Sequence, residues 1–132
     1  MWTLDTNMCS YILRRHSSQV IAHFERLEAS DLFLSALVAA ELRYGAAKLG
    51  SSKFAGYLED WLRLFDLRPW PVTASQHYAR LRCDLERQGT PIGGMDLLIA
   101  AHALAENAVL VTNNLREFGR VPNLRLENWM GP

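Results

Sequence analysis

Short apolar runs along the chain alternate with longer stretches whose apolar residues recur at helical spacing. The first run, at 1–4, stops at Asp5-Thr6-Asn7 and predicts a buried strand followed by a turn. The same reasoning predicts further strands at 31–35, 67–72, 108–112 and 124–126. The two prolines within 67–72 cannot donate ladder hydrogen bonds, so we expect this strand at an edge of the sheet.

The stretches between these strands predict helices. The second of them is expected to begin at Ser17 or Ser18, because serine is a favoured helix-capping residue. Gly50 and Gly89 are expected to end two others. The predicted helices run to about residue 14, then over about 18–27, 37–49, 52–65, 73–88 and 96–107.

Strands and helices alternate from end to end, with no internal repeat and no linker. This order predicts an α/β protein with a mostly parallel sheet and helices on both faces, formed by one domain over residues 1–132. In such sheets, ligands bind beyond the carboxyl ends of the strands. Functional residues are therefore expected directly after the predicted strands.

Composition narrows the class of protein. The 14 Lys and Arg residues balance the 14 Asp and Glu residues, which argues against a general nucleic-acid coat but allows a local basic patch. No apolar run reaches the ~18 residues that span a bilayer, and the N-terminus lacks the pattern of a signal peptide, so we expect a cytoplasmic protein with no membrane contact. Cys9 and Cys83 fit no metal-binding spacing.

Three acidic residues occupy positions suited to chemistry. Asp5 ends the first predicted strand, Asp96 starts the helix that leads to the strand at 108–112, and Glu41 lies on a helix face with apolar neighbours. Each has a structural explanation by itself: Asp5 as a turn residue, Asp96 as a helix cap, and Glu41 as the partner of Arg43 or of another arginine. If the sheet forms as predicted, the three carboxylates meet at one crevice.

Such a cluster predicts a bound cation. Like charges about 4 Å apart repel by roughly 4 kcal/mol at an effective dielectric constant of 20, so the cluster needs a cation or raised pKa values. Oxygen ligands select Mg²⁺, with Mn²⁺ as a substitute, over zinc. A carboxylate-bound Mg²⁺ with open water positions suits phosphodiester hydrolysis, because it activates a water and neutralises phosphate oxygens.

A resemblance to a known family rests on four segments. They are Leu4-Asp5-Thr6-Asn7, the run Ala-Glu-Leu-Arg-Tyr-Gly-Ala at 40–46, the run at 89–103 that contains Gly93-Gly94-Met95-Asp96, and Leu-Val-Thr-Asn-Asn-Leu-Arg-Glu-Phe at 110–118. With these segments in this order, the chain resembles PIN-domain nucleases over nearly its whole length. It most closely resembles the VapC toxins of VapBC toxin–antitoxin pairs, which are metal-dependent endoribonucleases.

The resemblance implies a role for each residue of the site. Asp5, Glu41 and Asp96 become the catalytic, metal-binding acids, with Asp5 and Asp96 as the direct ligands of Mg²⁺. Thr6 and Thr112 correspond to hydroxyls that orient these carboxylates. The family also implies the PIN fold, with strand order 3-2-1-4-5.

The chain departs from the family pattern at its fourth acid. Many PIN domains have an acid where this chain has Asn114, which implies one firmly bound metal and a weak or substrate-completed second site. Glu117, three residues later, either substitutes for that acid or is an exposed turn residue. Five arginines flank the predicted site and are candidates for contact with RNA: Arg14, Arg15, Arg43, Arg116 and Arg120.

The resemblance further implies partners and a substrate. It implies a homodimer, a cognate VapB-like antitoxin whose tail blocks the site, and higher-order assembly with that antitoxin as an open question. VapC toxins cleave structured RNAs, often tRNA or rRNA. The alternative is a catalytically degenerate PIN domain that only binds RNA or a partner protein; Asn114 favours it and the three acids disfavour it.

Other enzyme classes fit less well. A haloacid-dehalogenase-type phosphatase needs a second Asp two residues after the first, where this chain has Asn7. A dinucleotide-binding domain needs a Gly-x-Gly-x-x-Gly segment after a strand, which the chain lacks. His102 is assigned to the core, because metal-dependent hydrolysis needs no histidine.

Overall fold

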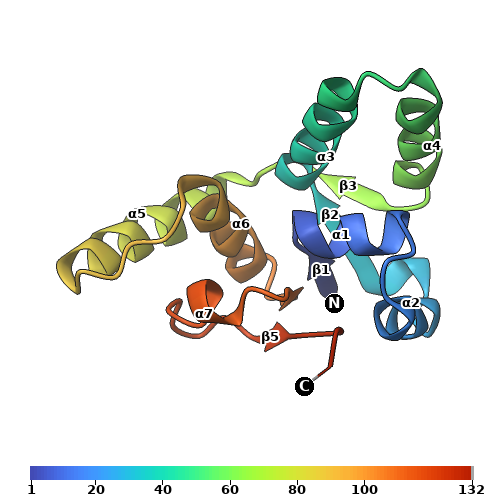
Figure 1. The fold of residues 1–132 in the computed structure, drawn as a ribbon. Helices are drawn as coiled ribbons and strands as arrows, with labels where there is room; N and C mark the ends of the chain where they lie inside the picture. The colour runs from blue at the N-terminus through green and yellow to red at the C-terminus, as the bar shows by residue number, and fades with distance from the viewer. Residues whose placement is uncertain (132) are drawn as a thin grey trace.

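A five-stranded sheet forms the centre of the computed structural model, which describes residues 1–131. Its strand order is β3-β2-β1-β4-β5, and each neighbouring pair is parallel (Figure 1). The predicted α/β fold and the order 3-2-1-4-5 are therefore confirmed. The strands are β1 (Trp2–Leu4), β2 (Leu32–Ser35), β3 (Asp66–Arg68), β4 (Val109–Val111) and β5 (Leu126–Glu127).

Helices connect the strands. Along the chain they are α1 (Thr6–Leu13), α2 (Ser18–Glu25), α3 (Ala36–Leu49), α4 (Ser52–Leu62), α5 (Val72–Arg87), α6 (Gly94–Ala105) and α7 (Leu115–Phe118), with a 3-10 helix over Ala29–Asp31. Helices α5 and α6 pack against each other as a pair that projects to one side of the sheet, whereas α1 packs against α2 and α3 (Figure 1). None of the described helices is long and apolar enough to cross a membrane.

Strand β1 lies in the middle of the sheet, between β2 and β4. Its register pairs Trp2 with both Leu32 and Val109, and Leu4 with Val111. Leu4 and Val111 are fully buried, as expected for parallel strands that are covered on both faces and therefore have nearly continuous apolar runs. The middle strand, from the start of the chain, thus pairs with a strand that begins at Val109.

Three strands end at the same edge of the sheet, and a helix-capping residue lies at the end of each strand or shortly after it. Asp5 follows β1 and caps α1, Ser35 ends β2 and caps α3, and Asn114 follows β4 and caps α7; each side chain accepts a hydrogen bond from a backbone N–H of its helix. Short polar side chains are favoured there because the first N–H groups of a helix have no partner within it. Three helix N-termini are therefore gathered beside the carboxyl ends of β1, β2 and β4.

The structure corrects several predicted boundaries. The last strand is Leu126–Glu127 and not 124–126, because its bounds are set by pairing with β4 and not by its own apolar pattern. The fourth helix ends at Leu62, before Phe65. Helix α6 begins at Gly94 with Gly93 as its N-cap, so Asp96 lies in the first turn and is not the capping residue. Helix α7 was not predicted.

Candidate active site

Asp5 is held at the carboxyl end of β1 by two hydrogen bonds. The Thr112 hydroxyl donates to Oδ2 at 2.6 Å, and the backbone N–H of Met8 donates to Oδ1 at 2.8 Å. The residue is only 5% exposed. Burial raises the pKa of Asp5, the two hydrogen bonds lower it, and the charge of Glu41 raises it. Asp5 therefore acts both as the cap of α1 and as a buried carboxylate at the strand edge.

Glu41 approaches this edge from α3. It is half-buried, and the Thr6 hydroxyl donates a hydrogen bond to its Oε1. Arg43, the alternative partner, instead forms an ion pair with Glu59 of α4, with Nη2 and Oε1 2.9 Å apart. Glu41 is thus fixed by a hydroxyl and forms no ion pair within residues 1–131.

Asp96 lies half-buried in the first turn of α6. Its pKa is raised to about 6, first by burial and then by repulsion from Glu117, with further contributions from the charges of Asp5 and Glu41. Asp5 and Glu41 are far from Asp96 in the sequence, and both were predicted to share a site with it. Asp5 and Glu41 therefore lie close enough to Asp96 for their charges to act on it.

Glu117 is a fourth carboxylate beside Asp96. Its Oε1 accepts the backbone N–H of Gly93 at 2.6 Å, and its Oε2 accepts the side-chain amide of Asn114 at 3.0 Å. It is half-buried and is not an exposed turn residue. The spacing Asn-x-x-Glu is that of a helix N-cap and the third helical position, and this signal could have revealed α7 and the orientation of Glu117 from the sequence.

The charge of this site is not balanced by the protein. Within residues 1–131, no ion pair involves any of the four carboxylates, Asp5, Glu41, Asp96 and Glu117. In the same part of the chain, no three acidic, histidine or cysteine side chains converge into a ready-made metal cage. Mg²⁺ commonly uses one or two carboxylates and keeps several waters. The carboxylates of this site supply oxygen ligands of the kind that this cation uses.

Comparison with known proteins agrees with the geometry of the site. The family model described as PIN domain matches residues 3–124. The chain belongs to the PIN-domain family. Within that family it is 40% identical over 131 residues to Ribonuclease VapC2 of Rickettsia felis, covering 98% of both chains.

One more relative and one solved structure show which group of PIN domains this chain resembles. It is 35% identical over 127 residues to the tRNA(fMet)-specific endonuclease VapC of Salmonella typhimurium, covering 96% of both chains. The structure of DNA-bound VapBC from the same organism superposes with a TM-score of 0.89 at 35% identity, covering 97% of both chains. The prediction of a VapC-type toxin ribonuclease from a type II toxin–antitoxin pair is thereby confirmed.

The candidate RNA-binding arginines of the PIN domain differ in their availability. Arg14 lies over the Phe54 ring, 5.8 Å from its centroid, and Arg120 donates to a backbone carbonyl of the loop between α5 and α6. All four of the side chains of Arg14, Arg15, Arg116 and Arg120 are nevertheless exposed. Contact between these arginines and RNA stays a prediction.

His102 lies in the core of the PIN domain. It is 1% exposed and its Nδ1 is 2.9 Å from the Ser35 hydroxyl, while its ring packs against Phe33. Burial lowers the pKa of His102. These contacts connect α6 to β2, which is consistent with a structural role.

Proposed function

We propose that this chain hydrolyses phosphodiester bonds in a structured RNA, such as a tRNA, with Mg²⁺ held by Asp5 and Asp96 and supported by Glu41. The observation that carries the proposal is the set of uncompensated carboxylates at the carboxyl edge of β1 and β4. Such a set is costly unless a cation binds to it. Mn²⁺ is expected to substitute for Mg²⁺.

The chain's own residues prepare this site. When bound, the metal supplies Lewis acidity that activates a water and neutralises charge on the phosphate. The hydrogen bonds from Thr112 and Met8 fix both oxygens of Asp5 before any cation arrives. Asp96 has a pKa raised to about 6, and a bound cation would favour its ionised form. The hydrogen bond from Thr6 keeps Glu41 oriented.

Glu117 is proposed as the replacement for the family's fourth acid. Asn114 then acts as a positioning residue, because its side-chain amide donates to Glu117 Oε2 and its side-chain carbonyl accepts the Glu117 backbone N–H at 3.3 Å. A carboxylate held in this way adds negative charge beside Asp96. It supports the binding of a cation without being a direct ligand.

The relatives suggest a substrate and a partner to test first. One of them is named a tRNA(fMet)-specific endonuclease, so tRNA is proposed as the substrate class. Several solved neighbours are complexes of a toxin with its antitoxin, so a VapB-like antitoxin is proposed as the partner of this chain. A homodimer is proposed as the toxin's own assembly.

Cleavage of total small RNA by purified protein, freed of antitoxin, tests the proposal. Reactions contain Mg²⁺, Mn²⁺ or EDTA, and compare the wild type with Asp5→Asn and with Asp60→Asn, which removes an exposed acid of α4 that pairs with Arg63. Discrete metal-dependent fragments from the wild type and Asp60→Asn, absent with Asp5→Asn, are expected. Equal fragments from Asp5→Asn, or none from the wild type, would overturn the proposal.

A further inference from the structure

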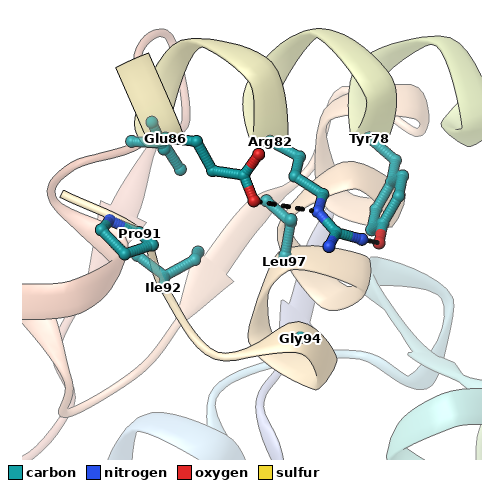
Figure 2. A pocket seen from close by; sticks show the side chains of 8 residues that line it. Tyr78, Arg82, Glu86, Pro91, Ile92, Gly94 and Leu97 are labelled. Atoms are coloured by element: carbon teal, nitrogen blue, oxygen red, sulfur yellow. Dashed lines mark hydrogen bonds and ion pairs between the residues drawn. The ribbon is translucent and has the colours of Figure 1, made fainter. Parts of the chain in front are cut away.

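A small pocket lies between α5 and α6 (Figure 2). Its volume is about 170 Å³. Leu85 of α5 and Leu97 of α6 are buried and form apolar parts of its wall, while Ile92 closes it from the connecting loop. Gly94, another lining residue, precedes Asp96 by two positions. The pocket therefore lies next to the first turn of α6, which carries Asp96.

The size of the pocket limits what it can hold. Pockets for whole small-molecule ligands measure about 300–1,000 Å³, so this one accommodates a fragment about the size of one planar ring system. Tyr78 contributes an aromatic ring to the lining, and Ile92 contributes an aliphatic side chain. Aromatic and aliphatic walls favour a flat, unstacked group such as a nucleobase.

One edge of the pocket carries a paired cation and anion. Arg82 Nε lies 3.3 Å from Glu86 Oε2, and Arg82 Nη1 donates to the Tyr78 hydroxyl at 2.8 Å. Figure 2 shows the Arg82 side chain extending from α5 toward α6, between Tyr78 and Glu86. The side chains of Arg82 and Glu86 are 57% and 58% exposed. The edge thus presents guanidinium donors beside the two oxygens of one carboxylate.

We propose that this pocket binds an unpaired guanine base of the RNA, adjacent to the phosphate that is cleaved; this inference rests on the proposed ribonuclease function. Guanine alone among the four bases offers two neighbouring N–H donors, N1–H and N2–H, which match the two oxygens of the Glu86 carboxylate. Its O6 lies beside them and accepts from Arg82. Stacking on the Tyr78 ring completes the contacts.

The pocket is held in a fixed position relative to the carboxylates. The loop that lines it is tied to α7 and the segment after it by the Gly93 N–H to Glu117 bond at 2.6 Å and by the Arg120 to Pro91 carbonyl bond at 3.0 Å. Glu117 also faces Asp96. A base seated in the pocket would therefore fix which phosphate of a single-stranded loop reaches the site.

Binding of mononucleotides tests the pocket without any cleavage. The backbone amide signals of Ile92, Gly94 and Leu97 are followed by NMR in EDTA while GMP, AMP, CMP or UMP is added to the wild type, Glu86→Gln or Asp84→Asn. Asp84→Asn is the matched control, because Asp84 is also an acid of α5 but lines a different hollow. GMP is expected to shift these signals at concentrations about tenfold lower than the other nucleotides do, and Glu86→Gln to remove that preference. Equal shifts from all four nucleotides, no shifts, or an unchanged preference in Glu86→Gln would overturn the proposal.

Cleavage of RNA hairpins with randomised loops is the second test of the guanine pocket. Sequencing of the cleaved products is expected to show guanine enriched about tenfold at one fixed position from the cut, with the enrichment lost in Glu86→Gln and kept in Asp84→Asn. Cleavage without such enrichment would overturn the guanine pocket and leave the nuclease intact. Absence of cleavage by the wild type in Mg²⁺ would contradict the proposed function, while the NMR result would still decide the pocket.

Discussion

The Thr112 hydroxyl donates a hydrogen bond to Oδ2 of Asp5 at 2.6 Å, although 107 positions separate the two residues in the chain. Thr112 follows β4 and Asp5 follows β1, so the parallel pairing of these strands brings the two side chains together. The same Thr112 oxygen accepts the backbone N–H of Asn114 at 2.9 Å. One hydroxyl therefore connects the buried acid at the start of the chain to the segment that orients Glu117.

Replacing Thr112 with valine is expected to raise the pKa of Asp5 further, because the hydrogen bond that opposes the effect of burial is lost. It also leaves a buried acceptor unsatisfied, which costs about 1–3 kcal/mol of unfolding free energy. The acidic limb of the pH–rate profile for RNA cleavage should move to higher pH. Urea unfolding measures the stability change, and Thr112→Ser, which keeps the hydroxyl, is expected to retain both properties. An unshifted acidic limb in Thr112→Val would contradict this role.

Asp96→Asn is expected to abolish cleavage and to stabilise the metal-free protein above pH 6. The folded state raises the pKa of Asp96 from its ordinary value of 3.8 to about 6, so the folded protein binds this proton more tightly than the unfolded chain does. The ionised carboxylate therefore destabilises the fold above pH 6, and this effect disappears as the pH falls toward 4. The stability difference between variant and wild type in EDTA should be largest at pH 7.5 and small at pH 4.

Urea unfolding in EDTA at these two pH values measures the difference. Asp60→Asn is the control, because Asp60 is an exposed acid outside the site. Added Mg²⁺ should raise the melting temperature of the wild type more than that of Asp96→Asn, since binding to the folded state alone stabilises it. A less stable Asp96→Asn protein at pH 7.5 in EDTA would show that the main role of Asp96 is structural.

Glu117→Gln is expected to lower the affinity for Mg²⁺ by roughly tenfold while preserving the fold, since partners that surround a metal's ligands commonly affect affinity or activity 10- to 100-fold. The variant keeps an oxygen that can accept the Gly93 N–H but removes the charge that repels Asp96. The Mg²⁺ concentration for half-maximal cleavage measures the effect. An unchanged Mg²⁺ requirement would show that Glu117 only holds the loop at Gly93 in place.

His102→Gln is expected to destabilise the protein by about 1–3 kcal/mol and to leave metal-dependent cleavage in place. Burial lowers the pKa of His102, so the folded protein binds this proton less tightly than the unfolded chain does. The stability that neutral His102 contributes is present above the unfolded pKa of about 6.5 and is lost as the pH falls below it. Unfolding at pH 7.5 and pH 5.5 should therefore show a smaller pH effect in the variant. Loss of cleavage in fully folded His102→Gln would assign the residue to the chemistry.

The sequence predicted the sheet well because its inner strands β1, β2 and β4 are largely buried and therefore form short apolar runs. Leu126–Glu127 was displaced in the prediction because its limits depend on hydrogen bonds with β4, such as the Thr112 N–H to the Glu127 carbonyl, and not on a pattern of its own. Helix α7 was missed because four residues are too few to show a helical period.

Asp5 and Asp96 were chosen from their places beside predicted strands and Glu41 from its apolar helix face, and their role as metal ligands stays a prediction. Their partners could not be predicted with the same certainty. Whether Arg43 pairs with Glu41 or with Glu59 depends on the packing of α3 against α4, which spacing along one helix does not reveal. The position of Glu117 likewise depends on the path of the loop that brings Gly93 to it.

The central position of β1 also bears on how this toxin is synthesised. Its neighbour β4 begins at Val109, and both Thr112 and Glu117 follow that strand. A nascent chain that has left the ribosome only as far as α6 therefore lacks one partner of its middle strand and the groups that orient Asp5 and flank Asp96. Parallel pairing between such distant segments forms late and slowly. Translation products that terminate early cannot assemble the nuclease site. The cell that makes this protein therefore meets its nuclease activity only after nearly the whole chain has been completed.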